Sequence, residues 1–574
     1  MMSRLDCAER CFPQEASNRA GSAMSLAVAV MLAFGGTATT QAAEFLTHHV
    51  RNVAAATEVG RLPANQLMSL DVVLPVRDKS ALDAFVAEVT NPASPNFRHY
   101  LTPAEFTAKF GPSQTDYDTT VQYLVKSGLK IKGGNLDRRD IQVEGSVSAV
   151  ETAFNVKMRT YRHPTENRLF FGPDREPSTS LAIPLWHISG LDNYSIPHPL
   201  FVKRSEVARR LGVSPDAVGP RATTGSGPSA SFLGSDMRAA YYGGTQLTGA
   251  GQHLGLLEYY GTDLDDLTTY FNNVHQTNHV PITLTSTDGT STDCTEANGC
   301  DDGEQTLDMT QAIGMAPGLA GLTMYVGGTD TAIISAMTTD NPLPRTIGCS
   351  WGWTPADPST LDQYFEQMAA QGQTFFAASG DSSTWSSQNE AWPADDAYVV
   401  SVGGTDLTTG SAAGAWASET AWADSGGGKS PDGIAIPSWQ AIRGVINSSN
   451  KGSTTLRNGP DVSANADFTF YVCGDQTDCT ANEYGGTSFA APMWAGYIAL
   501  VNQQAAANGR APVGFINPVI YAANEVNGQL SSTYKTTFHD VTKGTSGSYS
   551  AATGYDLVTG WGSPRAALIT TLAP

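Results

Sequence analysis

Hydrophobic and polar positions follow two different patterns along the chain, and the change lies near residue 229. In the first part, 68–74 and 141–145 alternate apolar and polar residues as strands with one buried face do. Helical spacing of apolar residues marks three further segments: 80–89 (after a serine cap), 113–127 and 148–154. This pattern predicts a small α/β domain over 44–202.

From Ser229 onward, short runs of apolar residues replace the alternation. Four runs have the length of strands buried on both faces: 253–258, 322–326, 374–378 and 399–402. Helical patterns lie between them: 301–316, 329–337 and 361–371. Buried strands that alternate with helices predict a parallel sheet covered on both faces, here within 229–574.

The segment 203–228 separates the two parts. It is polar and carries four arginines, Arg204, Arg209, Arg210 and Arg221, before a run of Thr, Gly and Ser. Such a segment predicts a flexible linker that proteases can cleave.

Charge is distributed unevenly over the 574 residues, whose net charge is -21. From Ser229 to the end there are 10 basic and 33 acidic residues, against 24 and 22 in the part before it. Such an acidic surface repels nucleic acid and anionic membranes, which excludes both as partners. With so few cations the chain gains little positive self-repulsion when its carboxylates neutralise, and this composition suits an acidic medium.

The N-terminal region 1–43 predicts export. Residues 24–34 form an apolar run about as long as a signal-peptide core, and Gln41-Ala42-Ala43 offers small residues for cleavage. No apolar run of about 18 residues follows, so we predict no membrane span. We therefore expect a secreted, extracellular protein.

Seven cysteines fit this compartment. Cys7 and Cys11 precede the apolar run and would be lost with it. Polar spacers separate Cys294 from Cys300 and Cys473 from Cys479, which is compatible with two local disulfides and lacks the spacing of a zinc site, although spacing alone does not decide the pairing. Cys349 remains, and its apolar neighbours predict that it is buried.

Candidate chemistry begins at 484–494, where two glycines and a threonine precede Ser488 and a run of small apolar residues. This predicts a sharp turn into a buried helix with Ser488 at its N-terminus, where free N–H groups favour developing negative charge. Ser488 is the candidate nucleophile. For the stretch taken alone, a helix N-cap is an equally good interpretation.

Three carboxylates are candidates for the groups that activate such a serine. Glu304 and Asp308 are four residues apart on one predicted helix face, where burial would raise the pKa of at least one and let the pair share a proton. Asp381 follows a predicted strand, at the sheet edge where ligands gather, and in protonated form it can donate to an oxyanion. Taken alone, Glu304 and Asp308 are more simply interpreted as a solvated helix face. Asp381 taken alone is more simply interpreted as part of an Asx-turn at a strand end.

Other classes of protease fit less well. A subtilisin-type enzyme needs a histidine base in a His-Gly-Thr-like setting, and none of the ten histidines has one. A pepsin-type enzyme needs two Asp-Ser/Thr-Gly turns, and only 424–426 supplies one. A binding protein that kept a similar fold but lost its chemistry remains an alternative. The presence of Ser488, Glu304, Asp308 and Asp381 argues against it, because such a protein could have lost any of them.

Together these segments resemble the sedolisin family, the serine-carboxyl peptidases made with an activation propeptide. The resemblance covers nearly everything after the signal region. It rests on motifs in the family's order: Glu304-x-x-x-Asp308, CSWG at 349–352, SGD at 379–381, VGGT at 402–405, SGGGKS at 425–430, GTS at 486–488 and two C-terminal loops. It implies a subtilisin-like parallel sheet flanked by helices, preceded by a small α/β propeptide domain with a mainly antiparallel sheet.

The resemblance also implies a role for each candidate residue. Ser488 would attack the peptide carbonyl with Glu304 as general base and then acid. Asp308 would orient Glu304 and help to manage its proton, and Asp381 would help to form the oxyanion hole.

Two aspartates among glycines near the C-terminus, Asp540 and Asp556, are the kind of ligands that a hard cation needs. Loops without metal are the alternative. The resemblance implies one structural calcium ion, held by these carboxylates and by the carbonyls of Val541, Ala552 and Gly554. The chain departs from the family in having Ala552 where glycine is expected, which matters little for a carbonyl ligand.

The sequence therefore predicts a secreted, acid-acting, monomeric peptidase made as a self-processing zymogen, with peptides or proteins as substrates and its own propeptide as intramolecular inhibitor. Endopeptidase and tripeptidyl-peptidase action both remain open. From the charge split we expect the propeptide to bind the acidic domain at neutral pH and to loosen as carboxylates protonate. Cleavage within 203–228 would follow.

Overall fold

The computed structural model describes residues 43–50, 53–54, 56–219, 222–295, 300–354, 358–389, 391–477 and 479–574. Of the predicted signal region 1–43 only Ala43 lies within these ranges, so Cys7 and Cys11 lie outside them, as does Arg221 of the predicted linker. No helix within the described ranges is long and apolar enough to cross a membrane.

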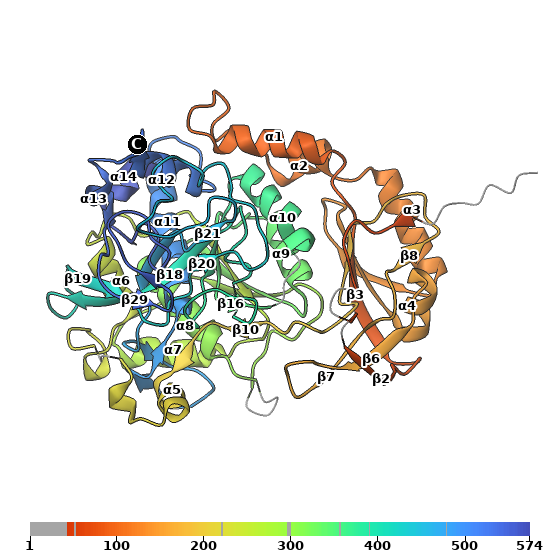
Figure 1. The fold of residues 1–574 in the computed structure, drawn as a ribbon, viewed down its shortest axis with the longest axis horizontal. Helices are drawn as coiled ribbons and strands as arrows, with labels where there is room; N and C mark the ends of the chain where they lie inside the picture. The colour runs from red at the N-terminus through yellow and green to blue at the C-terminus, as the bar shows by residue number, and fades with distance from the viewer. Residues whose placement is uncertain are drawn as a thin grey trace, which may run out of the picture. The chain divides into compact units, whose positions relative to one another are not determined.

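The N-terminal part is the α/β domain that its alternating pattern predicts (Figure 1). Its main sheet is antiparallel in the order β4-β5-β3-β9. The strands are β3 Leu67–Val73, β4 Lys130–Gly134, β5 Asp140–Ser146 and β9 His187–Ser189. A second antiparallel sheet joins β2 Thr57–Arg61, β6 Met158–Arg162 and β7 Leu169–Pro173. The helices are α1 Lys79–Thr90, α2 Pro103–Phe110, α3 Gln114–Lys126 and α4 Val147–Phe154.

Two helix starts differ from the sequence prediction. Helix α1 is capped by Asp78, whose side chain accepts from Ala81 N, and not by a serine. Helix α2 was not predicted, although Thr102 and Glu105 form a capping box and proline occupies its first position.

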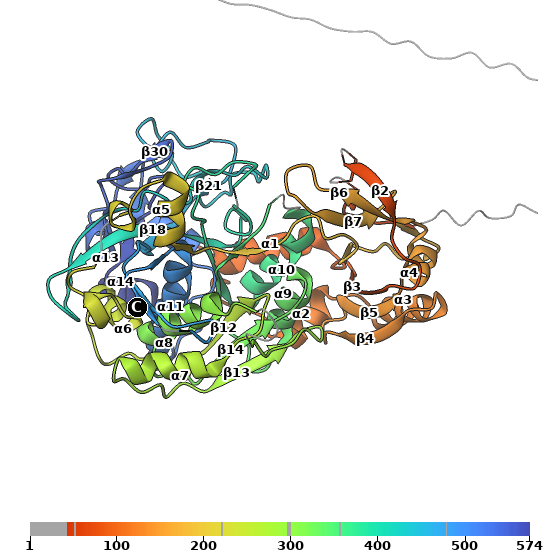
Figure 2. The ribbon, with the colours of Figure 1, turned by 90° about the horizontal axis from the view of Figure 1, so that it is seen from below.

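The C-terminal part contains the predicted sheet. Its eight strands run in the order β13-β14-β12-β15-β17-β18-β19, with β22 also paired to β18, and all pairs are parallel except β18 with β19. The strands are β12 His253–Glu258, β13 Ile282–Ser286, β14 Gly321–Val326, β15 Thr346–Cys349, β17 Thr374–Ala378, β18 Val400–Thr409, β19 Trp416–Ala421 and β22 Val462–Asn465. Figure 2 shows β12, β14 and β13 side by side.

Helices cover both faces of this sheet, as predicted. Alternate residues of one strand point to opposite faces, so Phe376 packs in one apolar cluster and Phe375 in the other. The helices of this part are α6 Gly234–Tyr241, α7 Leu264–Asn273, α8 Gly303–Met315, α9 Asp330–Thr339, α10 Pro358–Gln371, α11 Ala490–Ala507, α12 Asn517–Asn524, α13 Tyr534–Thr537 and α14 Ala567–Leu572.

Helices α8 and α11 lie against each other in the core, and a glycine permits their close approach. A Cβ at Gly496 of α11 would lie only 2.8 Å from the carbonyl oxygen of Ala312 in α8. Nearly all of α11 is buried, which explains its apolar sequence on every side. This packing brings the start of α11 next to the start of α8.

The segment predicted as a flexible linker is partly folded, which corrects that expectation. Residues Arg204–Leu211 form helix α5. Arg204 is fully buried, and its guanidinium donates to several backbone carbonyls, including that of Phe468 at 2.7 Å. The guanidinium thereby satisfies carbonyl groups of loops far away in the sequence, a role that local composition does not reveal.

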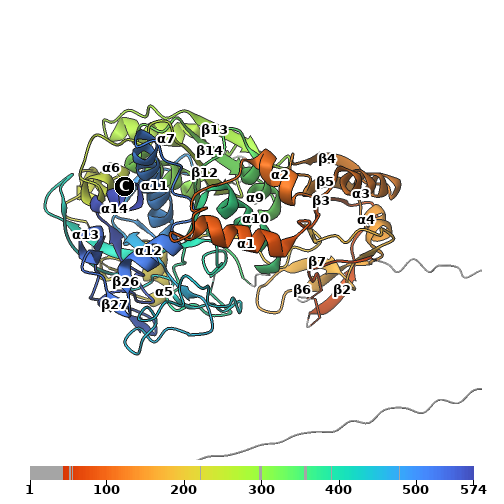
Figure 3. The same ribbon diagram turned by 90° about the horizontal axis from the view of Figure 1, so that it is seen from above.

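The two parts make specific contacts through α1 and α10, which Figure 3 shows side by side. Lys79 Nζ lies 2.6 Å from Glu366 Oε1. Arg139 is fully buried, donates to Gln367 Oε1 at 2.8 Å, and stacks 4.1 Å from the ring centre of Tyr364. The N-terminal part is thus held by buried polar contacts as well as by apolar packing.

Candidate active site

Ser488 lies in a short turn, Thr487–Phe489, that leads directly into α11. The residue before the turn, Gly486, has φ 152°. A Cβ at this position would lie 2.4 Å from the Leu200 carbonyl oxygen and 2.7 Å from Asp381 Oδ2. Glycine is therefore required here by crowding as well as by conformation.

The Ser488 hydroxyl points at one of the predicted carboxylates. Its Oγ donates to Glu304 Oε2 at 2.9 Å, and both residues are buried. Asp308, one turn further along α8, accepts from Ser350 Oγ at 2.7 Å. The i, i+4 spacing predicted from the sequence thus places both carboxyl groups on the face of α8 that meets the serine.

The two carboxyl groups lie close enough to influence each other's pKa, and such a pair can share one proton. Within the described residues, Glu304 Oε1 and Asp308 Oδ2 are buried and have no hydrogen-bond partner. Burial first, and then the charges of Asp308 and Glu258, raise the pKa of Glu304 well above its usual range. Burial raises the pKa of Asp308 to about 8. The pair therefore retains a proton well above the pH at which free carboxyl groups lose theirs.

Sequence reasoning missed a third buried carboxyl group, Glu258, at the end of β12. Its Oε2 accepts from Trp351 Nε1 at 3.0 Å, and burial and the charge of Asp308 raise its pKa well above the usual range. A signal was present, because Glu258 is a charged residue that directly follows the buried apolar residues 254–257 of its strand. Ser350 and Trp351 lie in the CSWG motif, where sequence analysis assigned no role.

Asp381, which follows β17, bonds to the residue just before Ser488. Its Oδ1 accepts from the backbone N and the hydroxyl of Thr487, both at 2.8 Å. Gly380 N donates to the same hydroxyl at 3.0 Å. Asp381 is thus fixed relative to the turn that carries the nucleophile.

A segment of the chain itself runs through this site. His198–Pro199 (β10) pairs antiparallel with Trp351–Gly352 (β16), and Val202–Lys203 (β11) pairs antiparallel with Tyr484–Gly485 (β25). Between them, Leu200 N donates to Ser350 O at 2.8 Å, and Leu200 O accepts from Ser488 N at 3.1 Å. Leu200 therefore presents its carbonyl group to the backbone N–H of the candidate nucleophile.

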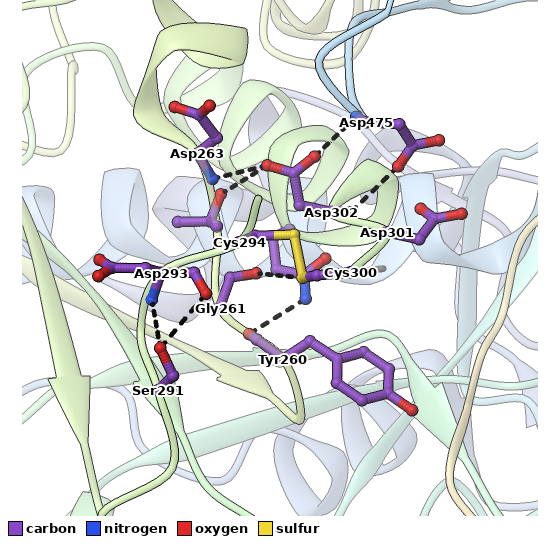
Figure 4. Close-up of a disulfide and its surroundings, with 12 residues drawn as sticks. Tyr260, Gly261, Asp263, Ser291, Asp293, Cys294, Cys300, Asp301, Asp302 and Asp475 are labelled. Atoms are coloured by element: carbon purple, nitrogen blue, oxygen red, sulfur yellow. Dashed lines mark hydrogen bonds between the residues drawn. A yellow bond between two sulfur atoms is a disulfide. The ribbon is translucent and has the colours of Figure 1, made fainter. Parts of the chain in front are cut away.

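Two disulfide-closed loops support the start of α8. Cys294–Cys300 and Cys473–Cys479 are both bonded, which resolves the pairing, and Cys349 is free and buried as predicted. The residues beside them exchange hydrogen bonds: Asp302 N donates to Asp475 Oδ1 and Asp475 N to Asp302 Oδ1 (Figure 4). These bonds lie two residues before Glu304 and hold the helix start in place.

The predicted calcium ligands lie in two C-terminal loops that meet. Gly554 N donates to Asp540 Oδ1 at 3.0 Å, and Asp556 is fully buried with its carboxylate accepting from Ala552 N at 2.9 Å. Asp540 Oδ2 is buried and lies 3.2 Å from Lys535 Nζ. No group of three or more His, Cys, Asp or Glu in the described ranges is arranged to hold a metal, so carbonyl groups such as that of Val541 would have to complete the site.

Comparison with known proteins extends the picture to the whole chain. Residues 54–194 match the Pro-kumamolisin activation domain, and residues 306–555 match the Subtilase family. Kumamolisin of Bacillus sp. (strain MN-32) is 30% identical over 552 residues, which span 91% of this chain and 94% of kumamolisin. The chain belongs to the sedolisin family.

Further relatives match the whole chain or part of it. Sedolisin of Pseudomonas sp. (strain 101) is 28% identical over 591 residues and covers 94% of both chains. Tripeptidyl-peptidase 1 of Homo sapiens is 28% identical over 269 residues, 41% of this chain and 44% of that enzyme. A solved structure of Pseudomonas sedolisin, a serine-carboxyl proteinase complexed with two molecules of pseudo-iodotyrostatin, covers 61% of this chain at 27% identity with a TM-score of 0.49.

Membership in the sedolisin family establishes the class of activity. The chain is a serine-type peptidase of zymogen type that carries an activation propeptide. Its substrates are peptides, and its propeptide is an intramolecular partner.

Proposed function

We propose that this peptidase is a secreted, acid-acting, monomeric endopeptidase that processes itself, with an acyl-enzyme on Ser488. The observation that carries the proposal is the geometry at Ser488, whose Oγ donates to Glu304 while its N–H donates to a peptide carbonyl. The hydroxyl and the carbonyl are thereby brought together with a base already in contact. The apolar run and small residues within 1–43 support secretion.

The reaction would proceed in two halves. Ser488 Oγ attacks the carbonyl carbon and passes its proton to Glu304. Glu304 and Asp308 then hold two protons between them, the one they already shared and the one from the serine. The oxyanion accepts from Ser488 N and from Asp381 in its protonated form. Glu304 then returns the proton to the leaving amine, and water cleaves the ester by the same steps in reverse.

Acid action follows from the protons that this scheme needs. Asp381 can donate to the oxyanion only while protonated, so activity is lost as the pH rises and that proton leaves. Glu304 must keep one oxygen free of protons to accept from Ser488, which limits activity at the lowest pH. Because the pair shares its proton, one acceptor oxygen remains in mildly acidic solution.

Endopeptidase action is supported by the path of the chain through the site. The three residues that end in Leu200 lie on one side of Ser488, and the polypeptide continues beyond them in both directions. A tripeptidyl-peptidase would have to close the cleft after three residues. We therefore favour cleavage within chains, and the Leu200–Phe201 bond as the first bond cut.

Acid treatment of the purified precursor is expected to produce a new N-terminus at Phe201. This position precedes the 203–228 segment expected from the sequence, because Leu200 carries the carbonyl held at Ser488 N. Edman or mass-spectrometric sequencing at intervals after a shift to pH 4 measures the order of cuts. Ser488→Ala should remain uncleaved, and pepstatin should not inhibit the parent enzyme. A first cut elsewhere that still requires Ser488 would refute the bond assignment alone.

We also propose one structural calcium ion at the C-terminal loops. Asp540 and Asp556 with the carbonyls of Val541, Ala552 and Gly554 form an oxygen-only set, which suits calcium. Asp540 Oδ2 is buried and lies 3.2 Å from Lys535 Nζ, so it already faces a cation, and a bound metal ion would take the place of that ion pair. When bound, the ion would add positive charge between two carboxylates and tie the loops together.

Removal of calcium is expected to lower the thermal midpoint by about 5 °C, because an ion that binds only the folded state stabilises it. Differential scanning fluorimetry of Ser488→Ala with EDTA, and after return of Ca²⁺ or Mg²⁺, measures this. Calcium alone should restore the midpoint, and Asp540→Asn should abolish the response. A midpoint unaffected by EDTA in the parent protein would argue against the ion.

A further inference from the structure

Building on the proposed function, we propose that the cleft selects substrates by the residues after the cleaved bond: an aromatic residue first and a lysine or arginine third. The segment in the cleft has this pattern, with Phe201, Val202 and Lys203 following the Leu200 carbonyl. Each of the two side chains lies against a formed surface of the peptidase part.

The first residue packs against an aromatic wall. The ring centres of Phe201 and Tyr484 are 5.4 Å apart and inclined by 46°. The start of α8 is also close, because a Cβ at Gly303 would be 3.8 Å from Phe201 Cζ. A flat side chain fills this space better than a small aliphatic one, and contact between rings adds to the burial.

The third residue lies beside an acidic surface. Lys203 Nζ is 3.8 Å from Asp475 Oδ2 and 5.1 Å from the ring centre of Tyr484. Both charged side chains are about a quarter exposed, which leaves their attraction less screened than at an open surface. A cation in this position is stabilised both by the aromatic ring and by the carboxylate.

The carboxylate is held in this orientation by its disulfide-closed loop. Asp475 Oδ1 accepts from Asp302 N at 3.1 Å, which leaves Oδ2 towards Lys203. Burial and the neighbouring Asp301 raise the pKa of Asp475 to about 7. The negative charge of Asp301, which raises this pKa, also acts on Lys203, so the surface stays acidic where Asp475 itself is protonated.

After self-cleavage, departure of residues 201–203 from the cleft, with Arg204 keeping its buried bonds, would open the same surfaces to other peptides. Backbone pairing with Tyr484–Gly485 would align an incoming chain as it aligns Val202–Lys203. Selectivity would then come from the side chains at the first and third positions.

The test uses the full chain after self-processing and quenched-fluorescent peptides with the chain's own sequence 196–203. At pH 5, replacing lysine with glutamate in the peptide should lower kcat/KM about tenfold. Replacing phenylalanine with alanine should lower it by a similar factor. Asp301→Asn, which keeps the acceptor for Gly303 N, should reduce the lysine-to-glutamate ratio to about threefold, and Asp475→Asn, which keeps the acceptor for Asp302 N, should shift it in the same direction by less.

Asp293→Asn is the matched control. It removes one charge beside the same Cys294–Cys300 disulfide, but its side chain points away from Asp301 and Asp475 (Figure 4). Its ratio should stay near tenfold. Equal kcat/KM for all peptides, or equal changes in Asp301→Asn and Asp293→Asn, would overturn the inference alone. Absence of any Ser488-dependent cleavage would instead overturn the proposed function.

Discussion

Glu304→Gln is expected to lower kcat by about 10⁴-fold, with little change in KM or in the thermal midpoint. Glutamine has the same shape and still offers an oxygen to Ser488 Oγ, which donates to Glu304 at 2.9 Å. It cannot take up the proton, so the serine would have to attack as a neutral hydroxyl. Steady-state kinetics on a peptide that the enzyme cleaves, with Ser488→Ala as the background, measures the loss.

Glu258→Gln is the comparison that makes this result specific. Glu258 is also a buried carboxyl group, but it bonds to Trp351 and not to Ser488. Its replacement is expected to lower kcat only about tenfold, because Glu258 acts on Glu304 only by helping to raise its pKa. Equal losses in both variants would mean that the cluster acts as a unit, and near-normal kcat in Glu304→Gln would remove Glu304 from the role of base.

The free energy of unfolding is expected to fall as the pH rises from about 4 to about 8. Burial raises the pKa of Asp308 and Asp467 to about 8, and that of Asp395 to about 7. Between the usual carboxyl pKa and these values the folded chain binds more protons than the unfolded chain, so stability is fully present in acid and is lost through this range. Scanning fluorimetry of Ser488→Ala should show a midpoint lower by roughly 5–10 °C at pH 8 than at pH 4.5.

A thermal midpoint that rises with pH would contradict the predicted loss of stability. Asp308→Asn provides a control, because it removes one of the titrating groups and should flatten the curve. The variant also lacks the charge that raises the pKa of Glu304, which should flatten it further.

Stability is also expected to fall with rising pH where the propeptide meets the peptidase part. Burial raises the pKa of Asp71, which accepts from Thr329 Oγ1 at 2.6 Å, and of Glu366, which pairs with Lys79, to about 7. Acid therefore stabilises the contact between the propeptide and the peptidase part at these groups. This is opposite to the loosening of the propeptide that the charge split predicts. We infer that cleavage, and not protonation of these groups, releases the propeptide.

Local patterns in the sequence were sufficient for much of the fold. The two-residue period at 68–74 and the apolar run at 374–378 correspond to β3 and β17, because side-chain direction depends only on nearby backbone geometry. The helical period placed Glu304 and Asp308 on one face for the same reason. The capping box at Thr102 was equally local and was overlooked.

Composition was a weaker guide where long-range contacts decide the outcome. The polar, arginine-containing stretch after Lys203 read as flexible, yet α5 forms there because Arg204 bonds to carbonyls such as that of Phe468. Propensity is a weak prior that tertiary contacts override. Glu258 was overlooked in the same way, since its partner Trp351 is 93 positions away.

The sequence by itself determined the two kinds of domain, the candidate nucleophile and the two carboxylates of α8, because these follow from spacing of a few residues. The tertiary structure decided which groups meet. It placed Ser488 Oγ on Glu304, 184 positions away, and Leu200 O on Ser488 N, because the packing of α11 on α8 and the pairing of short strands join segments that share no local pattern. Proximity of this kind arises from packing of the whole core, so no short stretch of sequence contains it.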